Sequence, residues 1–477
     1  MTQTTAPEGL ESLARRVRDD LGRIAHPQMP WLTPRRTPAG DEALDVAIVG
    51  GGQCGLAAAF GLMRSKVDNI LVLDQAPRDR EGPWRTYARM HTLRSPKDFT
   101  GPDLDIPSLT YQSWHEARFG KESWADLDLI PKELWADYLL WYREVLGIPV
   151  RNEVEVVDIA PSGDLLALTL RRGDGGTETR HARKVVLATG QEGMGGWAMP
   201  APLDSLPRRL CVQAAEPIDF AALEGKSVIV IGAGASAFDN AAAAIEAGAS
   251  DVRLLCRRLE PQLVQPYRWL TFRGFLRHFS ELDDMWRWRF MNVILGLREA
   301  FPQHTYDRCA MHPNFRVTSG AAVTGASVEG DHARLVTPAG SFEADFVIVA
   351  TGIAMDFAAR PELARFHDNI ATWADRYAPP AEERNERLGG FPYLADDYAF
   401  VEREAGRTPW IRDVHLFSIA STMSFGASGS SINAMTTAIP KLVHGITRGL
   451  FRDDVEQHWA SLLAYDVPQA IIKDAAA

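Results

Sequence analysis

One short pattern occurs twice in this chain and limits the folds that it can adopt. The segments DVAIVGGGQCGLAAA (45–59) and SVIVIGAGASAFDNA (227–241) each contain an apolar run, a glycine-rich turn and a run of small residues. A buried strand, a tight turn and a helix in this order open a βαβ unit, and the backbone N–H groups at the start of such a helix bind phosphate. The duplication predicts the α/β fold class with two Rossmann-like dinucleotide-binding domains.

The first copy has the complete glycine pattern. Gly50, Gly52 and Gly55 occupy the three glycine positions of G-x-G-x-x-G. The first permits the tight turn, the second lets the backbone approach a pyrophosphate, and the third lets the helix pack closely on the strand. The next strand ends at Asp74, where a carboxylate can accept hydrogen bonds from ribose hydroxyls. A glycine-rich turn without a ligand is the structural alternative.

The second copy differs at the end of its following strand. Gly232 and Gly234 match the pattern, and Ala237 stands at the third position. Where the first copy has an acid, this copy has Arg257 and Arg258. A guanidinium can bind a 2′-phosphate bidentately, whereas a carboxylate would repel it. The second site is therefore predicted to prefer NADPH over NADH, unless the arginine pair is only a solvated strand end.

The order of motifs resembles that of the two-dinucleotide-domain flavoproteins, and within them the class B, single-component monooxygenases. This group includes the flavin-containing monooxygenases, the Baeyer–Villiger monooxygenases and the N-hydroxylases, and a bacterial urate-hydroxylating flavoenzyme branch is similar in outline. The resemblance covers roughly residues 45–450. The matching pieces are GGGQCG, EGPWRTY, MHTLRSPK, VVLATG, GAGASAFDNA, CRR and VIVATG, in this order along the chain.

The resemblance implies that the nicotinamide domain is inserted into the flavin domain. The expected parts are an N-terminal helical extension and linker (1–44), the first part of the FAD-binding domain (45–205), the NADPH-binding domain with an aromatic-rich helical insertion at 261–316 (206–345), and the second part of the FAD-binding domain (346–477). The insertion is expected to cover the site, with a core element or a dimer contact as the alternatives.

The activity that the resemblance implies is an FAD-dependent monooxygenase. NADPH would reduce FAD, the reduced flavin would capture O2, and a C4a-(hydro)peroxyflavin would transfer one oxygen atom to a small organic substrate. Two positions depart from the family pattern, since Gln213 replaces a linker His and Arg94 replaces an Asn three residues before Lys97. An NAD(P)H-dependent flavin reductase or oxidase, a urate-hydroxylase-like flavoenzyme, and a redox sensor or scaffold therefore stay open.

Site residues are predicted from these motifs. Arg94, Ser95 and Lys97 are the catalytic candidates, because a cation near the flavin could stabilise negative charge or orient a carboxylate; a salt bridge within the loop is the alternative. A helix starting near Ser430 would direct its positive end at the flavin. Ser236 could cap its helix or contact phosphate. The predicted cofactor-binding residues are Gly50, Gly52, Gln53, Cys54, Gly55, Asp74, Gln75, Trp84, Arg85, Thr189, Gly190, Gly232, Gly234, Ala235, Ser236, Ala237, Arg257, Arg258, Thr351, Gly352, Ser431 and Asn433.

Composition excludes several other classes. The four cysteines (Cys54, Cys211, Cys256 and Cys309) include no close pair, which argues against a disulfide reductase, and Cys54, Cys211 and Cys256 are expected to be inert. No metal is expected, because no second ligand pair accompanies the cluster of His304, Asp307, Cys309 and His312. The net charge of -11 argues against nucleic-acid binding. Without a signal peptide or an apolar span, a cytoplasmic enzyme that does not bind membranes is expected, and the resemblance suggests a homodimer.

Overall fold

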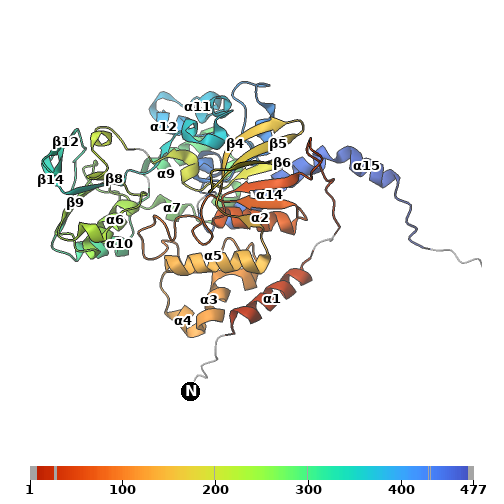
Figure 1. Ribbon diagram of the computed structural model, residues 1–477, viewed down its shortest axis with the longest axis horizontal. Helices are drawn as coiled ribbons and strands as arrows, with labels where there is room; N and C mark the ends of the chain where they lie inside the picture. Colours follow the sequence, from red (N-terminus) through yellow and green to blue (C-terminus); the bar gives the residue numbers. More distant parts are fainter. Residues whose placement is uncertain are drawn as a thin grey trace, which may run out of the picture.

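The computed structural model describes residues 8–25, 29–197, 199–297, 299–427, 429 and 431–470. Two sheets organise the chain and lie in different parts of the molecule (Figure 1). Each has one of the glycine turns at the carboxyl end of a central strand. We call the part built on the larger sheet the first lobe and the part built on the smaller sheet the second lobe. None of the described helices is long and apolar enough to cross a membrane.

The sheet of the first lobe has seven strands in the order β3-β2-β1-β6-β5-β4, with β17 also paired to β6. Their bounds are β1 Leu44–Val49, β2 Ile70–Leu73, β3 Val150–Arg151, β4 Val154–Ser162, β5 Leu165–Arg172, β6 Thr177–Leu187 and β17 Val414–Leu416. The long strand β6 pairs antiparallel with β5 through its first half and parallel with β1 and β17 through its second half. The hairpin β4–β5 therefore extends the main sheet.

The sheet of the second lobe has five parallel strands in the order β11-β10-β9-β15-β8. Their bounds are β8 Cys211–Gln213, β9 Ser227–Ile231, β10 Asp251–Leu255, β11 Phe315–Thr318 and β15 Phe346–Val349. Because β15 pairs with β8 and β9, the predicted domain boundary at 346 is wrong, and this strand belongs to the second lobe. The apolar run FVIV lies between β9 and β8 in this parallel sheet and is mostly buried.

The predicted helical insertion at 261–316 is too long. The aromatic-rich helices are α7 Pro266–Trp269, α8 Arg273–His278 and α9 Asp284–Leu297. After them, α10 (Gln303–Ala310) packs against α6 (Ala235–Glu246) and leads into β11, so this part is an ordinary crossover of the second sheet. Phe275, Phe279 and Trp288 are buried in a cluster that includes Trp373 and Met423, as the alternative of a core element requires.

The helices of the first lobe cover its sheet and complete its core, except the last one, which has no buried residue. They are α1 Leu10–Arg23, α2 Gln53–Arg64, α3 Tyr111–Phe119, α4 Lys121–Asp126, α5 Lys132–Leu146, α11 Trp373–Arg376, α12 Glu386–Gly389, α13 Thr422–Phe425, α14 Met435–Asp453 and α15 Val455–Leu463. The small residues of α2 allow α14 to approach it closely, since a Cβ on Gly61 would lie 2.9 Å from both Ile439 Cγ2 and Val443 Cγ2.

Helix α14 begins at Met435, later than the predicted start near Ser430, which lies outside the described residues. The reason is the close packing of the segment before it. A Cβ on Gly429 would lie 2.0 Å from the Ser418 carbonyl oxygen, and a Cβ on Gly101 would lie 2.0 Å from that of Ile432. The backbone is held against two other segments and turns into the helix only after them.

Two further elements were not anticipated. Strands β12 (Gly325–Glu329), β13 (His332–Thr337) and β14 (Gly340–Ala344) form a separate antiparallel sheet in the second lobe. The two connections between the lobes also pair with each other, since β7 (Gly195–Gly196) and β16 (Ala354–Met355) form an antiparallel ribbon. The chain thus enters and leaves the second lobe at one place.

Candidate active site between the two dinucleotide folds

The first glycine turn has the geometry that a pyrophosphate requires. Gly50 has φ +108°, and a Cβ there would lie 2.4 Å from the Ala188 carbonyl oxygen. A Cβ on Gly55 would lie 1.9 Å from the Gly50 carbonyl oxygen, so both positions exclude a side chain. At Gly52, the N-cap of α2, a Cβ would have no heavy atom within 4 Å. The turn is therefore closed on the protein side and open where a phosphate can approach the helix N-terminus.

Asp74 lies at the end of β2 beside this turn. Its Oδ2 accepts a hydrogen bond from Gly51 N at 2.6 Å, and its Oδ1 accepts one from Ala76 N at 2.7 Å. Burial raises the pKa of this carboxyl, and the two backbone donors oppose that rise. The fixed carboxylate is placed to accept hydrogen bonds from ribose hydroxyls, and Gln75 is exposed next to it.

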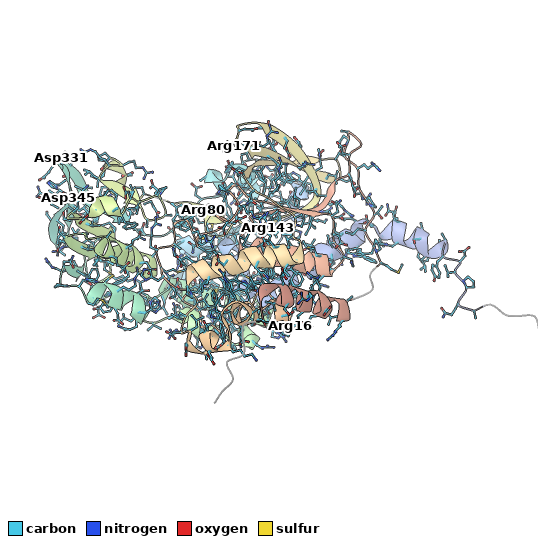
Figure 2. All side chains as sticks on the ribbon, turned by 60° about the horizontal axis from the view of Figure 1, so that its bottom comes forward. Arg16, Arg80, Arg143, Arg171, Asp331 and Asp345 are labelled. Atoms are coloured by element: carbon cyan, nitrogen blue, oxygen red, sulfur yellow. The ribbon has the colours of Figure 1, made fainter. Side chains whose placement is uncertain are left out.

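A pocket opens next to the first turn. Arg143 of α5, labelled in Figure 2, lies at its edge and donates to Glu81 Oε1 and to Asn152 Oδ1, both at 3.0 Å. Trp84 meets the ring of Trp135 edge-on at 6.5 Å between centroids. The pocket is lined by Gly51, Gly52, Leu56, Asp79, Glu81, Trp84, Ala136, Leu139, Leu140 and Arg143. An open glycine turn, an acid at the strand end and a partly aromatic pocket together fit FAD.

Other residues predicted for FAD surround the same turn. Gln53 Oε1 accepts a hydrogen bond from Trp135 Nε1 at 3.1 Å. Arg85 forms ion pairs with Asp79 and Asp137, so its guanidinium is already engaged by the protein. Thr189 lies inside the turn that follows β6, since a Cβ on Gly193 would lie 2.0 Å from Thr189 Oγ1.

The segment that precedes α14 also lies beside the first glycine turn. Cys54 Sγ lies 3.6 Å from the Gly429 carbonyl oxygen, which brings the segment before α14 beside the start of α2. Within that segment Ser431 Oγ donates to Asn433 Oδ1. Burial raises the pKa of the Cys54 thiol to about 12, so this group is a neutral packing residue at physiological pH.

The second glycine turn repeats the geometry of the first. Gly232 has φ +127°, and a Cβ there would lie 2.5 Å from the Ala350 carbonyl oxygen. Gly234 caps α6 and would have no heavy atom within 4 Å of a Cβ. Ala237 fits because its Cβ lies 3.5 Å from the position of a Cβ on Gly232, an ordinary contact. In both turns the glycine therefore packs on the alanine of an Ala-Thr-Gly sequence.

The first turn of α6 has no side-chain cap among the described residues. It begins at Ala235, and the hydroxyl of the exposed Ser236 makes no cap for this helix, so the capping alternative is wrong. Thr351 and Gly352 follow β15 and are exposed, with φ +91° at Gly352. These groups lie at the carboxyl ends of parallel strands, where open α/β sheets bind their ligands.

The two arginines after β10 differ in their contacts. Arg258 donates to the Gly296 and Leu297 carbonyl oxygens at 3.0 and 3.3 Å, at the end of α9. Arg257 is exposed and makes no side-chain hydrogen bond or ion pair with any residue that the structure describes. Arg257 is therefore the guanidinium that remains available for a 2′-phosphate.

The three catalytic candidates have unequal surroundings. Arg94 forms ion pairs with Asp239 at 2.8 Å and Glu299 at 3.6 Å. Burial would lower the pKa of Arg94, but the two carboxylates raise it. Lys97 donates to the Trp124 carbonyl oxygen at 2.8 Å and lies over that indole ring, which fixes the end of α4. Ser95 is half-buried between them. Their part in the reaction stays a prediction.

A polar cluster that the motifs did not identify lies beside the connection between the lobes. Tyr87 and Trp197 meet edge-on at 5.4 Å between centroids. Burial raises the pKa of Glu192, and a hydrogen bond from Trp197 opposes that rise. Tyr87 is the last residue of EGPWRTY, Glu192 follows VVLATG by two residues, and Trp197 lies further along the same segment. The polar and aromatic residues in and next to these motifs are the sequence signal that could have identified this cluster.

The residues with possible metal-ligand spacing do not converge. Cys309 Sγ donates to the Phe238 carbonyl oxygen at 3.3 Å inside the core, whereas Asp307 accepts a hydrogen bond from Gln303 at the surface. In the described ranges no three His, Cys, Asp or Glu side chains are grouped to hold a metal ion. All four cysteines are free and buried.

Comparisons with known proteins agree with this geometry. A family model described as FAD-NAD(P)-binding matches residues 47–192. A FAD-dependent urate hydroxylase of Xanthomonas campestris pv. campestris is 38% identical over 460 residues, which is 96% of this chain and 96% of the relative. Ornithine N-hydroxylase of Kutzneria sp. 744 shares the fold with a TM-score of 0.64 and 17% identity over 85% of this chain and 99% of its own. Ornithine hydroxylase of Pseudomonas aeruginosa also shares the fold, with a TM-score of 0.64 and 16% identity, and the match covers 86% of this chain and 99% of its own.

Two dinucleotide folds, one inserted into the other, define a flavoprotein oxidoreductase. The chain belongs to the family of FAD-dependent hydroxylases, which are flavoprotein monooxygenases. The predictions of fold class, enzyme class, and FAD with a nicotinamide dinucleotide as cofactors are confirmed. When bound, FAD would supply electron transfer from the nicotinamide and activation of O2, and the residues around the first glycine turn are the ones predicted to bind and orient it.

Proposed function

We propose that this protein hydroxylates urate, with NADPH as the electron donor and O2 as the source of the oxygen atom. One oxygen atom enters urate, and the other leaves as water with two electrons from NADPH and two protons. The observation that carries the proposal is the full-length similarity to the urate hydroxylase, at 38% identity over 96% of both chains. An alignment of that extent leaves only 4% of either chain unmatched.

Arg257 supports NADPH as the donor. It follows β10 at the place where an acid would select against a 2′-phosphate, and its guanidinium has no partner among the described residues. A bidentate guanidinium–phosphate contact is a strong charge-assisted interaction. The neighbouring Arg258, which binds the end of α9, holds this strand end in place.

Unpaired donors at the face between the lobes support a polar planar substrate. Arg89 of the first lobe donates to the Glu216 carbonyl oxygen at 3.3 Å, and Gln213 N donates to Glu216 Oε1 at 2.9 Å. Arg89 Nε, Arg94 Nε and Gln213 Nε2 are buried there without a partner in the described part of the chain. Buried donors favour a bound acceptor, and urate presents carbonyl oxygens and a negative charge.

The proposal is tested by following three quantities at once in the purified, FAD-loaded protein: urate absorbance, NADPH oxidation and O2 consumption. We expect equal amounts of each to be consumed, with little hydrogen peroxide. Xanthine serves as a matched purine control and ornithine as a control for the N-hydroxylase reaction. NADPH oxidation that yields only peroxide in the presence of urate would assign the chain to the flavin reductases or oxidases.

We also propose that the protein acts in the cytoplasm as a homodimer. The four buried, unpaired cysteines support a reducing compartment. The interface of the proposed dimer is the subject of the next subsection.

A further inference from the structure

Helix α15 (Val455–Leu463) is firmly attached at its base. Asp454, which precedes it, is fully buried and accepts hydrogen bonds from Arg183 at 2.9 and 3.0 Å, from Arg35 at 2.7 Å and from Thr33 N at 3.1 Å. These donors come from the N-terminal linker and from β6. The start of α15 is therefore fixed to two distant segments of the first lobe.

An aromatic cluster fixes the direction of the helix. Phe451 at the end of α14 stacks on His458 of α15 at 4.7 Å between ring centroids. Trp31 of the linker contacts both rings, at 6.5 and 6.4 Å. With its first turn held in this way, α15 projects beyond the body of the first lobe, as both views show (Figures 1 and 2).

The projecting helix carries an apolar stripe that the described part of the chain leaves largely exposed. No residue of α15 is buried, and its large apolar side chains are 51% to 68% exposed. They are Val455, Trp459, Leu462 and Leu463, and the exposed Tyr465 and Val467 follow. The spacing i, i+4, i+7, i+8 places the first four on one face about 100° wide, the width of a helix face that packs in a core. An apolar face of this size on a fixed helix indicates an interaction surface.

The charges next to the stripe argue against a membrane as the partner. Between 453 and 470 the chain has Asp453, Asp454, Glu456 and Asp466 but no Lys or Arg. Interfacial helices bind anionic lipid through basic residues on their polar face, and this segment would be repelled. A partner with an apolar face of the same kind is required.

We propose that α15 is the interface between two copies of this chain, with the helices packed stripe to stripe about a two-fold axis. Two-fold contacts use the same patch on both subunits, and a single stripe on a single projecting helix provides one. Burying the six exposed side chains removes on the order of 600 Å² from each copy, or roughly 1,200 Å² in total. That total reaches the lower end of specific interfaces. The proposal does not depend on the substrate.

The test is the mass of the FAD-loaded, full-length protein in solution, measured by light scattering and analytical ultracentrifugation. We expect twice the mass of one chain at micromolar concentration. Trp459→Glu and Leu462→Glu should weaken the dimer by at least about tenfold in dissociation constant. Ser461→Glu, on the opposite face of α15, is the matched control and should leave it unchanged. Flavin absorbance and circular dichroism confirm that each variant is folded.

A cross-link locates the contact. The native cysteines are all buried, so a cysteine introduced at the surface reacts alone. Leu462→Cys should form an intermolecular disulfide on mild oxidation, and Ser461→Cys should not. A wild-type protein that stays monomeric, a dimer that tolerates both charge variants, or α15-dependent binding to lipid vesicles without self-association would overturn the proposal.

Discussion

Arg94 Nη2 of the first lobe lies 2.8 Å from Asp239 Oδ2 on α6 of the second lobe. The same carboxylate accepts a hydrogen bond from Arg308 Nη1 at 3.1 Å, and only a small fraction of it is exposed. Arg308 also binds Glu246 and contacts His91. A buried acid between two guanidinium groups therefore joins the loop that follows the flavin motif to the helix that begins at the second glycine turn.

Removing Arg94 should disturb electron transfer more than cofactor binding. In Arg94→Gln, Asp239 keeps one guanidinium and the relative orientation of the lobes is less well fixed, so we expect anaerobic flavin reduction by NADPH to slow by about tenfold. Stopped-flow absorbance measures this rate. Arg277→Gln, at an exposed arginine, is the control. An unchanged reduction rate together with lost oxygen transfer would instead support a direct role of Arg94 in the reaction.

Asp74 should determine FAD affinity. Asp74→Ala removes the carboxylate that accepts a hydrogen bond from Gly51 N and that is predicted to face the ribose. We therefore expect FAD to bind about ten- to a hundredfold more weakly, a loss of about 1.4 to 2.7 kcal/mol. Fluorescence titration of the apoprotein with FAD provides the measurement, and the exposed Asp68→Ala is the control. Equal affinity in both variants would remove Asp74 from the cofactor site.

Arg257 should select between the two nicotinamide dinucleotides. In Arg257→Gln the guanidinium proposed to bind the 2′-phosphate is lost, so we expect the KM for NADPH to rise about tenfold while that for NADH stays constant. Steady-state kinetics with both donors tests this. Arg258→Gln serves for comparison, because the Arg258 guanidinium is already hydrogen-bonded to the end of α9. A parallel change for both donors would contradict the assignment.

Asp45 should make the stability depend on pH. Burial raises the pKa of Asp45 to about 6, although Arg183 nearby opposes the rise. Between pH ~4 and this value the folded chain keeps a proton that the unfolded chain has released, so the free energy of unfolding decreases as pH rises through that window. We therefore expect Asp45→Asn to be more stable than wild type at pH 8, by on the order of 1 kcal/mol, and no more stable at pH 4. Denaturant unfolding at both pH values measures this, and an equal effect at both would argue against titration of Asp45.

Local motifs predicted both nucleotide folds because glycine geometry is a local property. The contacts of Gly50 with Ala188 and of Gly232 with Ala350 join motifs that the sequence already marks, and their order gave the insertion of one fold in the other. The partners of Arg94 and Lys97 could not be predicted. Both side chains lie in one loop, yet they bind segments that are distant in the sequence.

The predicted boundaries of elements were wrong where tertiary packing, rather than the local sequence pattern, determines where an element begins or to which sheet it belongs. The apolar run at 346–349 fits either sheet, and only its pairing with β8 and β9 assigns it. The start of α14 moves to Met435 because Gly429 is pressed against Ser418. The predicted insertion included α10, because the whole stretch was assigned by its aromatic composition. In the structure this helix packs on α6 and belongs to the crossover before β11.

The ribbon formed by β7 and β16 brings the two connections between the lobes together. Both covalent links between the lobes run through it side by side, and Gly195 is confined there because a Cβ would lie 2.5 Å from Asp356 N. Away from the ribbon, α8 and α9 also hold the inserted part to the first lobe, through the buried cluster that includes Trp373 and Met423. A change in the angle between the lobes would therefore have to disrupt this apolar packing as well as the ion pair between Arg94 and Asp239.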